Sequence, residues 1–469
     1  MWWPKMKKII LTILFLSFSS LAHATLPVAV YEVRSSATAG NVNGGGFNSA
    51  RGGTDYTLQD GAQESKTDGA STASTTFTSA TATFTDAMKG NFLHLTAATG
   101  TPTVGWYEIV SVTNATTVVL DRVSGTYTLG TFYVGGAMSM ASTLDDEFFE
   151  IFIAGSTVWV KTGTYTSVEG ISVANDATAA LPVNIIGYNS ARDDNPTGAN
   201  RPTLAFGASA SVFNGQYYSF KNLIITTTTN AGFEVSQGNC LVNVKITNSS
   251  GTANAPALGI GGAATGGVFA INCEFVATGG DAVRASDTTC LVGCYIHDSV
   301  KGVRISSSTG TMLINNIIES CTTAIDILSA SSEHYFFNNT LYGAETPAGT
   351  GFNLPTTTVT KTRFIGNIIY GFTTGVNAGT NVGSNFWDYN NFYNNTTDRT
   401  NVTAGDNDLA VDPQFTDAAG GDFSIGTNLK AAGFPGAFPG SSTTGYLDVG
   451  AVQRTEPATQ TDILGDITG

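Results

Sequence analysis

The chain has 469 residues, of which only 12% are charged, and its formal net charge is −15. An acidic surface repels nucleic acid and anionic membranes, so neither is expected as a general partner. Glycine is abundant, at 54 residues, and β-branched and turn-forming residues outnumber those that favour long helices, which predicts an all-β protein.

Residues 1–24 have the features of a secretory signal peptide. Basic residues between Lys5 and Lys8 precede an apolar segment from Ile9 to Leu21, and Ala22-His23-Ala24 offers a cleavage site with small residues at both ends. The apolar segment is short for a bilayer span, and no later segment could cross a membrane as a helix. We therefore expect a secreted protein, extracellular or periplasmic, without a membrane span.

Residues 25–141 form an N-terminal region with a small inserted β module at about 55–133. The module is indicated by three alternating segments joined by turn residues, namely Phe92–Leu95, Trp106–Val110 and Thr117–Leu120. It either binds a partner or shields the end of the following domain. Next, Thr143–Ala154 begins with acidic residues and has helical spacing, which predicts a short amphipathic helix that caps the first coil of that domain.

Eight segments between about Thr157 and Tyr393 share one template, in which a β run carries Asn or Gly at its third position. These third-position residues are Asn222, Asn243, Asn272, Gly293, Asn315, Asn338, Gly366 and Asn390. Their spacing is close to 22 residues, which is typical of a solenoid. Asn and Gly tolerate the positive φ that a tight turn requires. Two longer steps place insertions at Ser249–Pro256 and Gly343–Gly349.

A second β run follows each first run by about ten residues, so we expect at least two parallel sheets. Alternation points the apolar residues of this run, such as Val283, into the solenoid and the polar residues outward. The outward column contains, in chain order, Glu234, Arg284, Arg304 and Asp326.

One position after each turn residue, a further column is expected to face inward. Its last four members, Asn316, Asn339, Asn367 and Asn391, predict a buried asparagine ladder in which each amide bonds to its neighbours. Cys273 and Cys294 precede them as stacked neighbours, either as free thiols or as a disulfide. The five cysteines have irregular spacing and do not form a disulfide framework.

The segment Thr157–Tyr165 resembles the opening coil of the pectate-lyase-like parallel β-helix superfamily. Ile185–Tyr188, Asp412–Phe415 with Gly421–Phe423, and Leu447–Ala451 extend the resemblance, which covers about Ser142 to Arg454. It implies a right-handed parallel β-helix over residues 142–454, followed by a flexible tail at 455–469. It does not imply one reaction, because the superfamily holds lyases, hydrolases, epimerases, adhesins and phage tail proteins.

The candidate site lies on the middle coils, where three basic residues within 21 positions form a local positive patch on an acidic chain. Lyases of this superfamily use Lys and Arg as base and acid on uronic-acid polymers, sometimes with Ca²⁺. The resemblance therefore implies the catalytic residues Lys301, Arg304, Arg284 and His297. We expect Tyr295, Glu319 and Asp326 to bind substrate, and Asp281 and Asp298 to hold Ca²⁺.

Two functions fit these observations. The first is a secreted carbohydrate-active protein that binds an acidic polysaccharide and, if it is an enzyme, cleaves it by lyase-like β-elimination rather than by hydrolysis, since no hydrolase motif is found. The alternative is a non-enzymatic surface adhesin or phage tail-fibre-like protein, for which charged columns are ordinary surface ladders. The signal peptide favours the first function, and the missing catalytic motifs favour the second. Either a monomer or a homotrimer is compatible with the sequence.

Overall fold

The structure is a computed structural model that describes residues 29–38, 41–139, 152–167, 172–173, 176–207, 211–213, 215–261, 267–286, 288–306, 309–328, 331–354, 359–379, 385–435 and 447–453. The described residues before position 140, together with residues 152–159, form one compact unit, and those from Val160 onward form a second. The predicted signal peptide and tail lie outside the described residues. So does most of the predicted capping helix, whose described end, Phe152–Ala154, is not helical.

The helical segments of the described residues are single 3-10 turns, and none is long and apolar enough to cross a membrane. They are η1 (Ser49–Arg51), η2 (Tyr56–Leu58), η3 (Asp86–Met88), η4 (Gly198–Asn200), η5 (Ala418–Gly420) and η6 (Thr427–Leu429).

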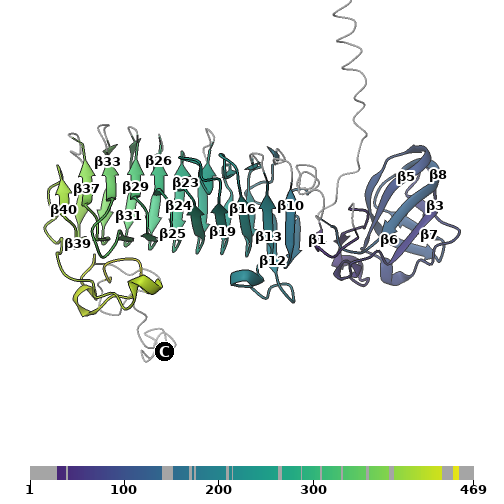
Figure 1. Ribbon diagram of the computed structural model, residues 1–469. Coiled ribbons are helices and arrows are strands. Elements are labelled where there is room, and N and C mark those ends of the chain that lie inside the picture. Colours follow the sequence, from purple (N-terminus) through teal and green to yellow (C-terminus); the bar gives the residue numbers. More distant parts are fainter. Residues whose placement is uncertain are drawn as a thin grey trace, which may run out of the picture. The chain divides into compact units, whose positions relative to one another are not determined.

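The first unit contains a closed antiparallel barrel with the strand order β3-β4-β7-β6-β5-β8 (Figure 1). Its strands are β3 (Glu64–Thr72), β4 (Thr76–Thr78), β5 (Phe92–Pro102), β6 (Gly105–Asn114), β7 (Thr117–Leu120) and β8 (Gly125–Val134), preceded by the short antiparallel pair β1 (Val30–Val33) and β2 (Gly46–Phe47). Aromatic side chains fill the barrel, with the rings of Phe77 and Phe132 4.9 Å apart edge to face. The predicted small β module is confirmed, although its closure into a barrel was not predicted, because β3 consists mostly of polar residues.

The second unit is a parallel β-helix whose coils stack in chain order from β10 to β40 (Figure 1). Each full coil contributes one strand to each of three parallel sheets. Sheet 1 contains β9 (Thr157–Lys161), β12 (Val183–Tyr188), β15 (Tyr218–Lys221), β18 (Cys240–Val242), β21 (Val268–Ile271), β24 (Thr289–Val292), β27 (Met312–Ile314), β31 (Tyr335–Phe337), β35 (Arg363–Ile365) and β38 (Phe386–Asp388).

Sheet 2 contains β10 (Thr164–Ser167), β13 (Thr203–Phe206), β16 (Ile224–Thr227), β19 (Lys245–Asn248), β22 (Glu274–Ala277), β25 (Tyr295–His297), β28 (Ile317–Glu319), β32 (Thr340–Tyr342), β36 (Ile368–Tyr370) and β39 (Asn391–Tyr393). Sheet 3 contains β11 (Ser172–Val173), β14 (Ser211–Phe213), β17 (Phe233–Val235), β20 (Leu258–Ile260), β23 (Asp281–Ala285), β26 (Lys301–Ile305), β29 (Thr323–Ile327), β33 (Thr350–Leu354), β37 (Thr374–Ala378) and β40 (Thr397–Thr400). A short parallel pair, β30 (Ser331–Ser332) and β34 (Val359–Thr360), completes the strands.

The predicted all-β parallel β-helix is confirmed, and the three sheets refine the expectation of at least two. Each first β run proved to be two strands, because the Asn or Gly at its third position forms a sharp corner between sheet 1 and sheet 2. Asn222, for example, has a φ of 58° between β15 and β16. The chain therefore changes direction inside a segment that reads as one continuous strand.

The corner of the last coil lies one residue earlier than predicted. Tyr389, with a φ of 59°, occupies the turn position there instead of Asn390. Asn390 consequently takes the place in the buried column that had been predicted for Asn391. Asn391 instead lies on the outward column of sheet 2, where its amide exchanges hydrogen bonds with the backbone of Val411. This register is favoured because the Asn390 amide donates a hydrogen bond to the buried carbonyl of Phe364 inside the coil.

The asparagine ladder thus consists of Asn316, Asn339, Asn367 and Asn390, which are all fully buried. The Nδ2 atom of Asn339 donates to Oδ1 of Asn367 at 3.0 Å and to the Leu313 carbonyl of the preceding coil at 2.9 Å. The backbone N–H of Asn339 donates to the same Oδ1 atom. Each amide therefore connects three successive coils.

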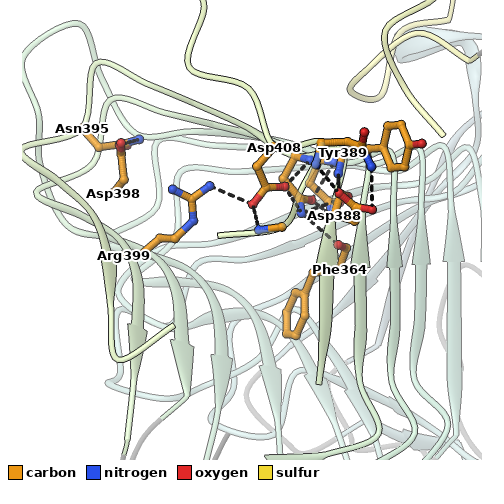
Figure 2. A network of polar contacts seen from close by, with 11 residues as sticks. Phe364, Asp388, Tyr389, Asn395, Asp398, Arg399 and Asp408 are labelled. Atoms are coloured by element: carbon orange, nitrogen blue, oxygen red, sulfur yellow. Dashed lines mark hydrogen bonds and ion pairs between the residues drawn. The ribbon is translucent and has the colours of Figure 1, made fainter. Parts of the chain in front are cut away.

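The ladder ends on a carboxylate rather than on another amide. Oδ1 of Asp408 accepts hydrogen bonds from the backbone N–H and the Nδ2 of Asn390, at 2.8 and 3.2 Å. Oδ2 of Asp408 pairs with Arg399 at 2.8 Å, and the neighbouring Asp388 binds the loop at Asn407 (Figure 2). Asp408 thus occupies the position that a fifth rung would take.

Cys273 and Cys294, which were predicted as stacked neighbours, are buried free thiols.

The outward face of sheet 2 is covered near its C-terminal end, where Tyr342 and Tyr370 pack against Phe423 and Val449 of the C-terminal segment. The polar outward residues of sheets 2 and 3 in the middle coils lie outside this covered region.

We predict that Asn339→Ala destabilises the β-helix, because it leaves the Leu313 carbonyl and the Asn367 amide oxygen short of donors. Each unpaired buried group costs about 1–3 kcal/mol. The midpoint of urea denaturation, followed by circular dichroism, should fall accordingly. Asn377→Ala, which removes an exposed rung on the outward face of sheet 3, is the matched control and should change stability by less than about 0.5 kcal/mol. Equal midpoints for the two variants would contradict the role of the ladder.

Candidate functional site

The candidate site lies on the outward face of sheet 3. Strand register aligns one residue from each of six successive coils in a single column, namely Glu234, Gly259, Arg284, Arg304, Asp326 and Asn353. We call these six residues the sheet 3 column. Successive members lie about 4.8 Å apart at the backbone, the spacing of hydrogen-bonded strands. The column therefore runs parallel to the solenoid axis.

The two arginines of the column converge on one buried carboxylate. Oδ2 of Asp281, whose side chain is 1% exposed, lies 3.3 Å from Nη2 of Arg284 and 3.3 Å from Nη1 of Arg304. Nη1 of Arg304 also donates to Oδ1 of Asn254, at 2.8 Å, from the predicted insertion. Two guanidinium groups share one negative charge, so this group retains a positive charge. The side chains of Arg284 and Arg304 remain 31% and 20% exposed.

Lys301 is held differently from the arginines. Its ammonium group lies 2.5 Å from Oδ2 of Asp326 in the next coil. Oδ1 of Asp326 accepts a hydrogen bond from Asn353 at 2.7 Å. Asp326 is almost fully buried by these partners. The predicted catalytic lysine and the predicted substrate-binding aspartate are therefore engaged with each other.

Glu234 was placed in the outward column by the sequence but was not predicted as a site residue. Its side chain lies across Gly259, such that a methyl group on Gly259 would approach Cγ of Glu234 to 2.7 Å. Burial raises the pKa of the Glu234 carboxyl, and the charge of Arg284 opposes this effect. The glycine at the same column position, one coil further on, was the sequence signal that could have drawn attention to this carboxylate.

The remaining predicted site residues lie on sheet 2 or at its edge, so the structure divides the predicted site into two groups. His297 lies between Glu274, at 3.2 Å, and Asp298, at 2.9 Å. Glu274 also pairs with Lys245, at 2.6 Å. The hydroxyl group of Tyr295 donates to Glu319. Lys245, Glu274, His297 and Asp298 therefore form a polar network of their own, separate from the arginine pair. The Tyr295–Glu319 pair adjoins it, because the rings of Tyr295 and His297 stack with their centroids 4.2 Å apart.

The charges of this network shift the pKa values of its members. Burial lowers the pKa of His297, but hydrogen bonds to Glu274 and Asp298 outweigh it and raise the pKa above its ordinary value. The hydrogen bond from His297, opposed by burial and assisted by Lys245, lowers the pKa of Glu274 to about 2. The two carboxylates thus favour the protonated form of His297, which suits it to a structural ion pair better than to the role of a base.

The predicted calcium ligands are not close partners. Asp281 belongs to sheet 3 and contacts two guanidinium groups, whereas Asp298 lies at the end of β25 in sheet 2. In the part of the chain that the structure describes, no three His, Cys, Asp or Glu side chains are grouped to hold a metal ion. The arrangement does not fit a calcium ion at these two residues, and calcium binding stays a prediction.

Comparison with known proteins finds low similarity to several solved structures. No protein-family profile and no curated protein sequence matches it. Among solved structures, a pectate lyase Pel9A matches 65% of this chain and 89% of its own, with 15% identity and a TM-score of 0.39. A rhamnogalacturonan lyase matches 58% of this chain and 84% of its own, with 12% identity and a TM-score of 0.31. A PL6 alginate lyase in complex with a trisaccharide matches 61% and 64%, with 14% identity and a TM-score of 0.30. Similarities this low do not assign an activity.

We predict that His297 makes stability depend on pH. Because the pKa of His297 is raised in the folded state, its ion pairs stabilise the fold fully at pH values below the pKa of the unfolded chain, about 6.5. This stabilisation is lost as the pH rises through the pKa of the folded state. The urea midpoint of the wild type should therefore exceed that of His297→Gln by more at about pH 6 than at about pH 8. An identical difference at both pH values would show that the ion pairs of His297 do not contribute.

Proposed function

We propose that this protein is a secreted carbohydrate-active protein that binds an acidic polysaccharide along the outward face of sheet 3 and cleaves it by β-elimination. The observation that carries the proposal is the pair Arg284 and Arg304, whose guanidinium groups contact the buried carboxylate of Asp281 while their side chains stay partly exposed. A uronate carboxylate is the ligand that such a pair would recognise, because guanidinium groups bind carboxylates in a fixed, forked geometry.

The overall negative charge of the chain means that a polyanion would be bound by a local cationic site and not by long-range attraction. The protein as a whole is acidic, and long-range attraction of a polyanion is therefore not expected. Screening at physiological ionic strength limits the repulsion to about 8 Å, so a nearby cationic pair can dominate the contact. The sheet 3 column also runs along the solenoid, which allows successive sugar units of an extended polymer to contact successive coils.

The same arginine pair supports the elimination chemistry. Removal of the proton at C5 of a uronate places negative charge on its carboxylate, and guanidinium groups held in position stabilise that charge. Hydrolysis is less well supported, because it needs two carboxyl groups on either side of the glycosidic bond. Asp281 and Asp326 are both buried and paired with cations.

We predict that Arg284→Ala weakens binding to the recognised polymer about 10-fold or more, because it removes a charged hydrogen-bond donor. Arg284→Lys keeps the charge but loses the forked geometry and should show an intermediate loss. Affinity electrophoresis in polygalacturonate, alginate and glycosaminoglycan gels, with and without Ca²⁺, measures this. Arg363→Ala, which removes an exposed arginine from sheet 1, is the control. If the wild type is not retarded in any of these gels, the proposal fails.

A second candidate function, a structural rod or adhesin, is favoured by the outward face of sheet 1. Two neighbouring columns there are apolar from β18 to β31, and Phe269 remains 46% exposed. Apolar surface of this kind is often an assembly surface.

For this candidate we predict a homotrimer in sedimentation experiments that dissociates on Phe269→Asp, because the substitution places a charge in the apolar contact. A monomeric wild type at all concentrations would contradict the rod and leave the carbohydrate-active function.

A further inference from the structure

We infer that Glu234 is the proton acceptor of the elimination reaction, an inference that rests on the proposed function. The reaction needs a group that takes the C5 proton while the arginine pair holds the carboxylate of the same sugar. The cationic residues expected from the sequence do not suit this role in the arrangement that the structure shows.

The cationic candidates are each engaged in other contacts. The ammonium group of Lys301 lies against Asp326 at 2.5 Å, and accepting a substrate proton would require that this ion pair first be broken. In their charged form the guanidinium groups of Arg284 and Arg304 donate hydrogen bonds and accept none, so neither takes a substrate proton unless it first loses one. Both are moreover oriented by Asp281. These three residues bind and neutralise charge, and they leave proton removal to another group.

Glu234 lies in the same outward column as the arginines, with only Gly259 between it and Arg284. Two strand spacings separate the backbones of Glu234 and Arg284, about 10 Å. The Glu234 side chain lies over Gly259, on the side that faces Arg284 along the column. A uronate whose carboxylate contacts Arg284 would therefore bring its sugar ring close to the Glu234 carboxylate.

The carboxylate of Glu234 is also chemically available. Among the described residues, it has neither an ion pair within 4.0 Å nor a hydrogen bond to a side chain, in contrast to Asp281 and Asp326. It is half-buried, and burial raises its pKa despite the charge of Arg284. A carboxylate with a raised pKa is a stronger base than an exposed one.

The step balances without any further reactant except water. Glu234 takes the proton from C5, and the electron pair of that bond forms the double bond between C4 and C5. The bond between C4 and the glycosidic oxygen breaks, and the oxygen leaves with its electron pair and takes a proton from water. Glu234 then returns its proton to the solvent. The products are a shortened polymer and a chain with an unsaturated end, which absorbs ultraviolet light.

Gly259 has a specific role in this arrangement. Its φ does not lie in the left-handed region, so alanine is compatible with the backbone there. The added methyl group would nevertheless meet Cγ of Glu234 at 2.7 Å and Oε1 at 3.5 Å. Gly259→Ala therefore displaces the Glu234 carboxylate without removing it, and it tests the position of the base separately from its chemistry.

The test compares wild type, Glu234→Gln, Gly259→Ala and the control Glu333→Gln, which alters an exposed carboxylate on the sheet 1 side. Each protein is incubated with the polymer that binds best, and unsaturated ends are followed by ultraviolet absorbance, while binding is measured by affinity electrophoresis. Glu234→Gln should lose about 100-fold or more in kcat, the usual contribution of a general base, with unchanged binding. Gly259→Ala should lose less, and Glu333→Gln should match the wild type. Circular dichroism confirms that each variant is folded.

The outcomes separate this inference from the proposed function. Cleavage by Glu234→Gln at the wild-type rate would overturn the role of Glu234 and leave the proposed function in place. A wild type that binds a polymer without cleaving it would overturn both that role and the cleavage part of the proposed function, and would leave only the binding part. A wild type that binds none of the polymers would overturn the proposed function itself.

Discussion

The hydrogen-bonded asparagine ladder inside the solenoid is the interaction on which the C-terminal coils of the β-helix depend. A parallel sheet of three-residue strands has little to hold its register, since a slip by one residue would move every side chain to the opposite face. The buried amides remove this freedom. Asn339 reaches the coil before it through the Leu313 carbonyl and the coil after it through Asn367. The ladder connects the coil of Arg304, through the Leu291 carbonyl, with the coil of Asp326 and with those that follow. The earlier members of the sheet 3 column, from Glu234 to Arg284, are aligned by the backbone pairing of their strands.

Much of this arrangement could be predicted from the sequence, because it follows from short-range rules that repeat. The period near 22 residues and the Asn or Gly turn positions predicted the solenoid, and alternation predicted that Arg284 and Arg304 point outward. At least two sheets were predicted, but the third was not told apart from the first two, since a corner made by a single residue with positive φ, such as Asn222, does not interrupt a β pattern. The last coil was misaligned by one residue, because a tyrosine at the corner lacks the turn signal of Asn or Gly.

The site was harder to predict than the fold, because partners depend on which sheet each residue joins. His297 and Lys301 are four positions apart, yet one belongs to sheet 2 and the other to sheet 3. Proximity in sequence suggested one cationic cluster, whereas the three-residue turn between β25 and β26 separates it into two networks. The sequence also could not show that Asp281 and Asp326 are occupied by cations, which leaves Glu234 as the available carboxylate of the column.

The carboxylate at the end of the ladder has a consequence for how the solenoid terminates. An amide both accepts and donates, so a stack of asparagines could in principle continue through a second molecule placed end to end, as it does along the axis of an amyloid fibril. A carboxylate only accepts. Asp408 receives both N–H groups of Asn390 and offers no donor beyond them, and its charge is satisfied by Arg399. The last rung therefore ends the chain of hydrogen bonds, so that the ladder itself offers no donor to a further molecule at this end of the solenoid.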